Sequence, residues 1–280
     1  MWSHALGTGR LVVVNAVPPD DPVPAGSDDL PRAARRPPAA RIRTARDRAR
    51  AELTREIKDE ARRQLAAEGA QRLSLRAVAR SLGMASSAVY RYFPSRDDLL
   101  TALIIDAYDA LGAAVEAADA AHPRPALRQR WRAACHAVRT WARDHPHEYA
   151  LIYGSPVPGY RAPGDTVGPA ARSPLVLVSV VRDAWAAGVL AAPAAGPLPP
   201  TLAVQTKRLA ETFAPGVPDV VVARTLIAWT QLFGMVSFEL FGHLVGSVDP
   251  SEDFFGYAVE QMADLIGLPG EPGLSHRAAT

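Results

Sequence analysis

The sequence predicts an all-α fold, and three observations support this prediction. Alanine, the residue with the highest helix propensity, dominates the chain outside its proline-rich segments. Apolar residues recur three and four positions apart, which is the spacing of one helix face. The alternation typical of a half-buried strand occurs over no appreciable length except residues 11–14. The 280 residues suffice for one or two domains with a buried core.

Composition excludes several classes of protein. The formal net charge is only +2, so any attraction to nucleic acid must come from local groups of basic residues. The single cysteine, Cys135, excludes an internal disulfide and a cysteine-based zinc site, and it agrees with the cytoplasm, where we expect the protein. We predict neither a secretory signal at residues 11–14 nor a membrane span at residues 220–245, because the first is too short and polar residues interrupt the second.

The first helix is predicted over residues 47–68. Its buried stripe repeats every four residues through Leu53, Ile57, Ala61 and Leu65. Gly69 ends this helix. Thr54 lies on its outer side, where the hydroxyl could contact a phosphate.

Residues 74–93 have the spacing of two short helices joined by a tight turn. The apolar stripe of the first helix is formed by Leu75, Val78, Ala79 and Leu82. Ser74 stands at the N-cap position, where its hydroxyl can accept a hydrogen bond from a free backbone N–H. Gly83 tolerates the positive φ that lets this helix stop and the chain turn sharply.

The second helix of the pair is predicted over residues 85–92, before Pro94. Its open face carries Ser86, Ser87, Tyr90 and Arg91. Small residues allow close approach to a DNA groove, hydroxyls reach phosphates or base edges, and arginine can bind guanine with two hydrogen bonds. The pattern predicts a helix-turn-helix for DNA binding, with an ordinary helical hairpin inside a larger bundle as the alternative.

A capping-box-like start at residues 95–98 begins the next long helix, whose apolar stripe reaches Val115. Arg96 lies in its first turn, where a positive charge opposes the helix dipole. We expect a DNA phosphate near that helix end to compensate.

The pattern of residues 57–69, 75–83 and 89–100 resembles the DNA-binding domain of the tetracycline-repressor (TetR) family. Residues 90–100 are the most specific part, because an aromatic pair, a serine, a basic residue, an acidic pair and two leucines seldom follow one another by chance. The resemblance implies a three-helix DNA-binding domain with a helix-turn-helix and a C-terminal helical ligand-binding and dimerisation domain. The expected segments are a disordered proline- and arginine-rich tail at 1–45, the two domains at 46–105 and 106–267, and a flexible end at 268–280.

The resemblance also implies a transcription regulator of double-stranded DNA, most simply a ligand-responsive repressor acting as a homodimer on a palindromic operator. The expected DNA contacts are Ser74, Arg76, Ser86, Ser87, Tyr90, Arg91, Tyr92, Arg96 and Thr54. Tyr92 could instead pack its ring against the hairpin. Two interpretations of the tail stay open: it is a solvated linker, or its arginines form an arm on the DNA backbone or in the minor groove.

In the C-terminal half, helices are predicted over residues 125–144, 146–153, 174–188, 201–213, 218–244 and 251–266. The arginines of the first of these helices are expected to form a solvated face, and Ser251 is expected to cap the last. The segment 229–234 resembles the Trp-His-Gly signature of one TetR C-terminal class, with Phe233 in place of His.

The last two predicted helices are apolar on more than one stripe, so each needs two packing partners. A second copy of the chain would supply the second partner, and a bundle core within one chain is the alternative. An apolar site for a small-molecule effector of unknown identity is predicted from aromatic and polar residues of this half. Its candidate residues are His136, Trp141, Tyr149, Tyr153, Arg182, Trp185, Trp229 and Phe233.

Motifs of enzymes are not found: the sequence has neither a phosphate-binding glycine loop nor a nucleophile elbow. His145 and His147 could bind a metal, but Pro146 between them is more typical of a turn at a helix start. We therefore expect no metal, no cofactor and no enzyme. The rival hypothesis is a helical enzyme or small-molecule carrier in which the hairpin is purely structural.

Overall fold

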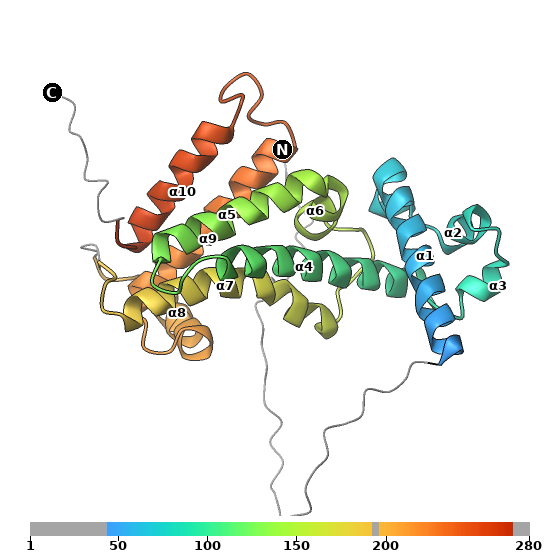
Figure 1. The fold of residues 1–280 in the computed structure, drawn as a ribbon, viewed down its shortest axis with the longest axis horizontal. Helices are drawn as coiled ribbons and strands as arrows, with labels where there is room; N and C mark the ends of the chain where they lie inside the picture. Colours follow the sequence, from blue (N-terminus) through green and yellow to red (C-terminus); the bar gives the residue numbers. More distant parts are fainter. Residues whose placement is uncertain (1–43, 192–195, 271–280) are drawn as a thin grey trace, which may run out of the picture. The chain divides into compact units, whose positions relative to one another are not determined.

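A computed structural model describes residues 44–191 and 196–270. These residues contain ten α-helices, two short 3-10 helices and no strand, which confirms the predicted all-α fold. The elements are α1 (Ala45–Glu68), η1 (Ala70–Arg72), α2 (Leu75–Ser81), α3 (Ser86–Val89), α4 (Arg96–Ala120), α5 (Leu127–Asp144), α6 (Pro146–Tyr153), η2 (Gly164–Thr166), α7 (Val167–Ala186), α8 (Pro200–Phe213), α9 (Asp219–Leu240) and α10 (Glu252–Ile266) (Figure 1). The chain forms two compact units, residues 1–56 and 57–280.

The described part of the first unit is the beginning of α1. Thr44 Oγ1 accepts a hydrogen bond from Asp47 N at 3.2 Å, and Asp47 Oδ2 accepts one from Thr44 N at 3.1 Å. This reciprocal cap starts the helix two residues before the predicted position. The tail predicted at residues 1–45 lies outside the described residues except for its last two, as does the strand-like pattern at 11–14.

In the second unit, α2 and α3 form the predicted hairpin. Ser74 caps α2, because its Oγ accepts a hydrogen bond from Ala77 N at 3.4 Å. α3 is shorter than predicted, since the chain leaves the α-helix after Val89 and continues as turns to Tyr92. In these turns Tyr92 N and Phe93 N both donate to Val89 O, at 2.9 and 3.1 Å.

The turn between α2 and α3 depends on Gly83, whose φ of +65° lies in the left-handed region. Gly83 N donates to Arg80 O at 3.1 Å, and Met84 N donates to Ala79 O at 2.8 Å. This pair of hydrogen bonds is a Schellman motif, and it occupies carbonyls that the end of α2 would otherwise leave unpaired.

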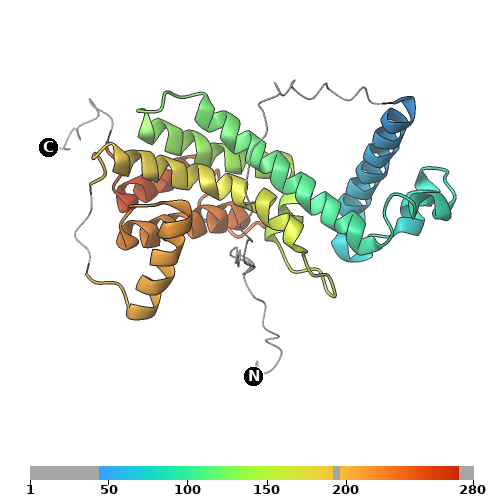
Figure 2. The same ribbon diagram turned by 90° about the horizontal axis from the view of Figure 1, so that it is seen from below.

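The core of the second unit is built around α4, which lies beside α5 and α7 (Figures 1 and 2). α9 and α10 pack against each other and against α5. The largest buried apolar side chains of these helices include Trp131, Leu177, Leu232, Phe255 and Met262. α9 is long and apolar enough to cross a membrane, but 44% of its most apolar window is buried, and core helices share this composition.

The structure corrects the predicted start of α7. The helix begins at Val167 and runs through Pro174, where the sequence predicted its first turn. Proline weakens a helix interior because it lacks an N–H donor. Arg172 offsets this weakness, because its guanidinium binds Asp109 and Glu116 of α4 at 2.7 Å each and so holds the first turns of α7 in place.

The prediction of a solvated arginine face on α5 holds for Arg143 but is wrong for three of its other arginines. Arg128, Arg130 and Arg139 are at most 9% exposed. Their carboxylate partners are Glu260 and Asp264 for Arg128, Asp119 and Asp183 for Arg130, and Glu239 and Glu252 for Arg139. The arginines therefore tie α5 to α4, α7, α9 and α10 from within.

Two further helix ends differ from the prediction. α9 ends at Leu240, because Gly242 adopts a φ of +78° and its N–H donates to a carbonyl of the last turn. Ser251 precedes α10 as predicted, but its hydroxyl does not cap that helix. Ser251 Oγ instead accepts a hydrogen bond from Arg139 Nη2 at 3.4 Å.

Candidate DNA-binding surface and ligand-binding site

The hairpin of α2 and α3 separates apolar from polar side chains. Leu75, Val78 and Val89 are at most 4% exposed and hold the hairpin together. The exposed polar side chains are Arg76, Arg80, Ser81, Ser86, Ser87, Tyr90 and Arg91. No carboxylate occurs between residues 74 and 93, so this surface is positively charged although the whole chain is nearly neutral. A phosphate backbone would be attracted to it.

The remaining predicted DNA contacts are less accessible. Ser74 is half-buried and its oxygen caps α2, although its hydroxyl proton can still be donated. Tyr92 is also half-buried. In the first unit, the Thr54 hydroxyl donates to Arg50 O at 2.8 Å within its own helix.

Arg96 is held by contacts within the protein. Its Nη2 donates to Ala70 O at 2.8 Å and its Nε donates to Leu73 O at 3.2 Å. These backbone carbonyls compensate the positive charge in the first turn of α4, and the contact of Arg96 with a DNA phosphate stays a prediction. Arg96 fastens the segment that leads into α2 to the beginning of α4.

A carboxylate of α4 fastens α1 in a similar way. Asp106 accepts hydrogen bonds from Lys58 Nζ at 2.8 Å and from Arg62 Nη2 at 2.6 Å. All three side chains are about one quarter to one third exposed, so water screens these ion pairs only in part. The position of α4 is therefore linked to both α1 and the segment before α2.

Four of the eight predicted ligand contacts come together in the second unit. The ring of Tyr153 lies 5.1 Å from that of Tyr149 and 4.4 Å from that of Phe233, and Trp229 lies 6.0 Å from Phe233. Tyr149 OH donates to Phe233 O at 3.0 Å. Burial raises the pKa of Tyr149 to about 12, so this tyrosine is neutral at physiological pH.

The other four candidates have different ring contacts or lie at the surface, and their part in a ligand site stays a prediction. The ring of His136 packs edge-on to Phe255, and that of Trp141 lies 5.2 Å from His145. Arg182 and Trp185 are exposed, because the buried stripe of α7 runs through Val180, Val181 and Ala184. The residue types of Arg182 and Trp185 did not reveal which face of α7 they occupy.

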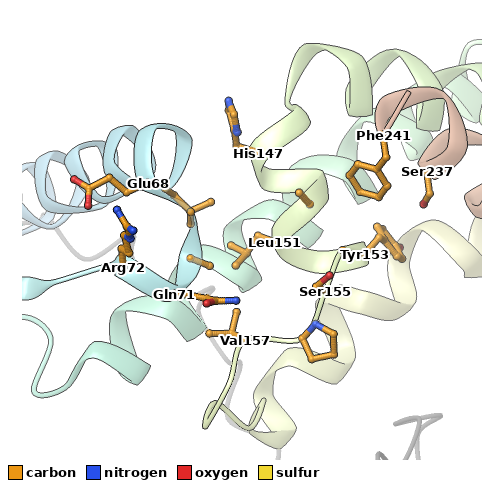
Figure 3. A pocket seen from close by; sticks show the side chains of 16 residues that line it. Glu68, Gln71, Arg72, His147, Leu151, Tyr153, Ser155, Val157, Ser237 and Phe241 are labelled. Atoms are coloured by element: carbon orange, nitrogen blue, oxygen red, sulfur yellow. The ribbon is translucent and has the colours of Figure 1, made fainter. Parts of the chain in front are cut away.

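A cavity of ≈ 680 Å³ lies in the second unit, between the end of α1 with η1 and the segment from α6 to residue 157, with α9 contributing to one wall (Figure 3). Tyr153 links it to the aromatic cluster. Its lining residues are Leu65, Glu68, Gly69, Ala70, Gln71, Arg72, His147, Ala150, Leu151, Tyr153, Gly154, Ser155, Pro156, Val157, Ser237 and Phe241. Only Tyr153 among them was predicted as a ligand contact.

Sequence reasoning missed several residues of these sites. Arg80 lies one turn after Arg76 on α2, and helical spacing alone could have placed it on the same face. Tyr108 packs edge-on to Tyr153 at 6.0 Å. Gln71 and Ser237 line the cavity but belong to no motif, so no signal in the sequence marks them.

The exposed sides of α9 and α10 carry several large apolar side chains among polar ones. The exposed apolar residues are Ile227, Phe238 and Phe241 at α9 and its end, and Phe254 and Tyr257 on α10. Their positions follow helical spacing on each helix. We call this set of five residues the α9–α10 face. Tyr257 is 65% exposed, which is unusual for a large ring on a helix that also packs into the core.

No group of three or more potential metal ligands occurs in the described part of the chain. Cys135 is fully buried, and burial raises the pKa of its thiol. A buried neutral thiol is a poor nucleophile, so Cys135 belongs to the core.

Comparisons with known proteins match this architecture. Residues 57–103 match the sequence model of bacterial regulatory proteins of the tetR family, and residues 131–262 match that of a tetracyclin repressor-like C-terminal domain. The first match includes α2 and α3. The second covers the aromatic cluster and all five residues of the α9–α10 face.

Individual relatives agree. The chain is 41% identical over 202 residues to the HTH-type transcriptional regulator Mb1846 of Mycobacterium bovis. The aligned stretch covers 69% of this chain and 83% of the relative. The same values hold for the regulator Rv1816 of Mycobacterium tuberculosis. The crystal structure of the regulatory protein SCO4313 is 36% identical, with a TM-score of 0.66 over 79% of this chain and 100% of that one. This chain therefore belongs to the TetR family of helix-turn-helix transcription regulators.

Proposed function

We propose that this regulator is a homodimeric, ligand-responsive repressor that reads a palindromic operator in the cytoplasm. The observation that carries the proposal is the exposed face of α2 and α3, where arginines and hydroxyls gather without any carboxylate. Repression in response to a small molecule is typical of the TetR family, and the curated relatives are named as transcription regulators.

The exposed side chains suggest separate roles in DNA binding. Arg76 and Arg91 are candidates for base edges, because a guanidinium can donate two hydrogen bonds to guanine. Ser86 and Ser87 are short enough to let α3 approach the groove closely, and Tyr90 can reach a phosphate or a base. Arg80 adds a positive charge on α2. Arg96 positions the hairpin through Ala70 and Leu73, and its partly exposed guanidinium stays a candidate for a phosphate contact.

A second copy of the chain is the proposed partner of the α9–α10 face. Exposed phenylalanine and tyrosine rings on adjacent helices cost free energy in water, and pairing with the same face of another copy would bury both. Two reading heads about 34–36 Å apart can occupy successive major grooves of a palindromic site. The dimer therefore accounts for both the apolar face and the use of two hairpins.

Selection of bound sequences from a random DNA pool tests this function against the rival of a helical enzyme or carrier. A dimeric regulator should enrich a palindrome whose half-sites are about one helical turn apart. Its affinity for the selected duplex should fall steeply as salt rises, because bound phosphates release counterions. A selection that enriches no motif, together with no binding to any duplex at low salt, would leave the rival in place.

A further inference from the structure

We propose that the 680 Å³ cavity between η1 and α6 is the effector site, that it takes an uncharged and mainly apolar molecule with a hydroxyl or amine donor, and that its occupant acts on α2 through Arg96 and Tyr160. The inference rests on the proposed function, because it assumes that the regulator responds to a ligand. The cavity borders the segment that leads into the hairpin, and it shares only Tyr153 with the aromatic cluster of the core.

The lining of the cavity indicates the ligand class. Leu65, Leu151, Pro156, Val157 and Phe241 supply apolar surface, and the volume falls within the range of ≈ 300–1,000 Å³ found for small-molecule sites. Glu68 and Arg72 carry opposite charges and both are exposed to solvent. A charged ligand would find no unopposed partner in the lining and would lose hydration, so an uncharged molecule fits better.

Ser237 indicates a donor on the ligand. Tyr149 OH donates its only proton to Phe233 O at 3.0 Å, so the contact between Tyr149 and Ser237 at 3.0 Å uses the proton of Ser237. The Ser237 oxygen then faces the cavity as an acceptor. A hydroxyl or amine of the ligand would satisfy it, while Gln71 and Ser155 can either donate or accept.

Both walls of the cavity are fastened to the first turns of α4. The η1 wall contributes Ala70, whose carbonyl accepts the 2.8 Å hydrogen bond from Arg96. The opposite wall contains Val157, whose carbonyl accepts from Tyr160 N at 3.2 Å. Tyr160 OH in turn lies 2.9 Å from Thr101 Oγ1. Arg96 and Thr101 are five residues apart on α4, so one short piece of helix holds both walls.

This arrangement couples the cavity to DNA binding. An occupant that separates the walls must move η1 or the 154–160 segment against the start of α4. η1 leads directly into Ser74, the N-cap of α2, so its movement shifts the reading hairpin. A ligand that binds the shifted state more tightly lowers operator affinity, and couplings between sites in proteins are typically 5- to 150-fold.

The neutral fluorescent probe 1-aminoanthracene, which combines an apolar ring system with an amine donor, tests the site. We expect the full chain to bind it, and Leu151→Trp to abolish binding by filling the cavity. Leu175→Trp, on the exposed side of α7 and away from the lining, is the matched control and should bind like the unaltered chain. Ser237→Ala should weaken binding by roughly 2- to 10-fold through the lost acceptor.

Failure of probe binding, or equal loss in both tryptophan variants, would refute the cavity as the site. For the coupling, saturating probe should weaken binding to the selected duplex at least fivefold, and Tyr160→Phe should bind the probe normally but show a smaller effect on DNA. If DNA affinity is unchanged when the probe is bound, the coupling is refuted but the cavity stays the binding site of the probe. If no duplex is bound at all, the proposed function fails while the probe still decides whether the cavity binds a ligand.

Discussion

Arg172 of α7 packs directly against Gly112 of α4: a Cβ placed on Gly112 would lie 2.7 Å from Arg172 Cβ. The same arginine binds Asp109 and Glu116, one turn to either side of the glycine. The absence of a side chain at Gly112 thus allows the guanidinium to lie flat along α4 and pair with both carboxylates.

Gly112→Ala should therefore destabilise the protein. Real Cβ atoms are not found as close as 2.7 Å to another side-chain carbon, and the clashing atom is the Cβ of Arg172, which cannot move without its backbone. Overpacking should exceed the gain in helix propensity, for a net loss of about 1–2 kcal/mol in the free energy of unfolding. Urea denaturation of the variant and of the unaltered chain measures this loss in the free energy of unfolding.

Gly168→Ala is the matched control, because it also lies in a helix but has open space around its Cβ position. It should leave stability unchanged or raise it slightly. Equal effects of the two substitutions would show that the contact between Gly112 and Arg172 does not limit the approach of α4 and α7.

Arg130→Met should be more damaging than loss of any exposed arginine. The Arg130 side chain is fully buried and donates to Asp119 and Asp183 at 2.7 Å each. Methionine keeps most of the volume but leaves Asp119 without its arginine and Asp183 with Arg124 alone, which should cost about 3 kcal/mol because both carboxylates are only partly exposed. Arg143→Met, on the same helix with a half-exposed side chain, should cost less than about 1 kcal/mol by the same thermal or urea assay.

We expect the protein to lose stability in acid because of the glutamates that pair with Arg139. Burial alone would raise the pKa of Glu239, but hydrogen bonds from Arg139 outweigh it and lower the pKa. Arg139 also lowers the pKa of Glu252, chiefly by a hydrogen bond. Since the unfolded chain then binds more protons, this stability is present above the unfolded glutamate pKa of about 4.3 and is lost as pH falls through the lower folded values.

Urea denaturation at a series of pH values between 7 and 3 measures this dependence. The unaltered chain should lose stability below about pH 4.5. Arg139→Met should be less stable at pH 7 and should lose less on acidification, because its glutamates no longer have lowered pKa values. Parallel curves for the two proteins would contradict the assignment.

The hairpin was predictable from the sequence because its determinants are local. Ser74 and Gly83 act on backbone groups within a few residues, so the cap and the turn follow from residue type and spacing. The extent of α7 was not predictable from the sequence. Pro174 weakens the helix locally, while Arg172 stabilises it through carboxylates about sixty residues away. Local rules fail where such distant contacts decide.

The ligand site was predicted only in part for the same reason. Tyr149 and Tyr153 lie one turn apart on α6 and were both predicted as ligand contacts, and Phe233 joins them from α9. Arg182 and Trp185 have the right residue types but lie on the exposed side of α7. The cavity is formed by η1, α6 and α9 together, so no single segment of sequence carries its pattern.

Phe238→Asp should prevent dimerisation. Phe238 is 55% exposed on the α9–α10 face, and a carboxylate there would be buried opposite its own copy across a two-fold interface. Sedimentation velocity should show monomers with an unchanged helical circular dichroism spectrum. Val204→Asp, 53% exposed on α8 and outside this face, should stay dimeric. A dimeric Phe238→Asp protein would place the interface elsewhere.

Arg91→Ala should weaken binding to the selected operator and relax its sequence preference. Arg91 is exposed directly after α3 and lies on the face without carboxylates. Loss of an arginine that donates two hydrogen bonds to a base typically costs about 1–3 kcal/mol and affects mainly one position of the site. Arg80 is proposed to supply charge only. Arg80→Ala should therefore weaken binding to all DNA sequences alike and reduce the salt dependence of the affinity by about one phosphate contact.

Arg208→Ala is the control for both variants, because Arg208 is equally exposed but lies on α8 in the C-terminal half. Its operator affinity and salt dependence should match those of the unaltered chain. Fluorescence anisotropy with the selected duplex and single-base variants, at two salt concentrations, separates the three outcomes. If Arg91→Ala keeps both its affinity and its base preference, Arg91 does not read the operator, and the reading face must be centred on Arg76 of α2.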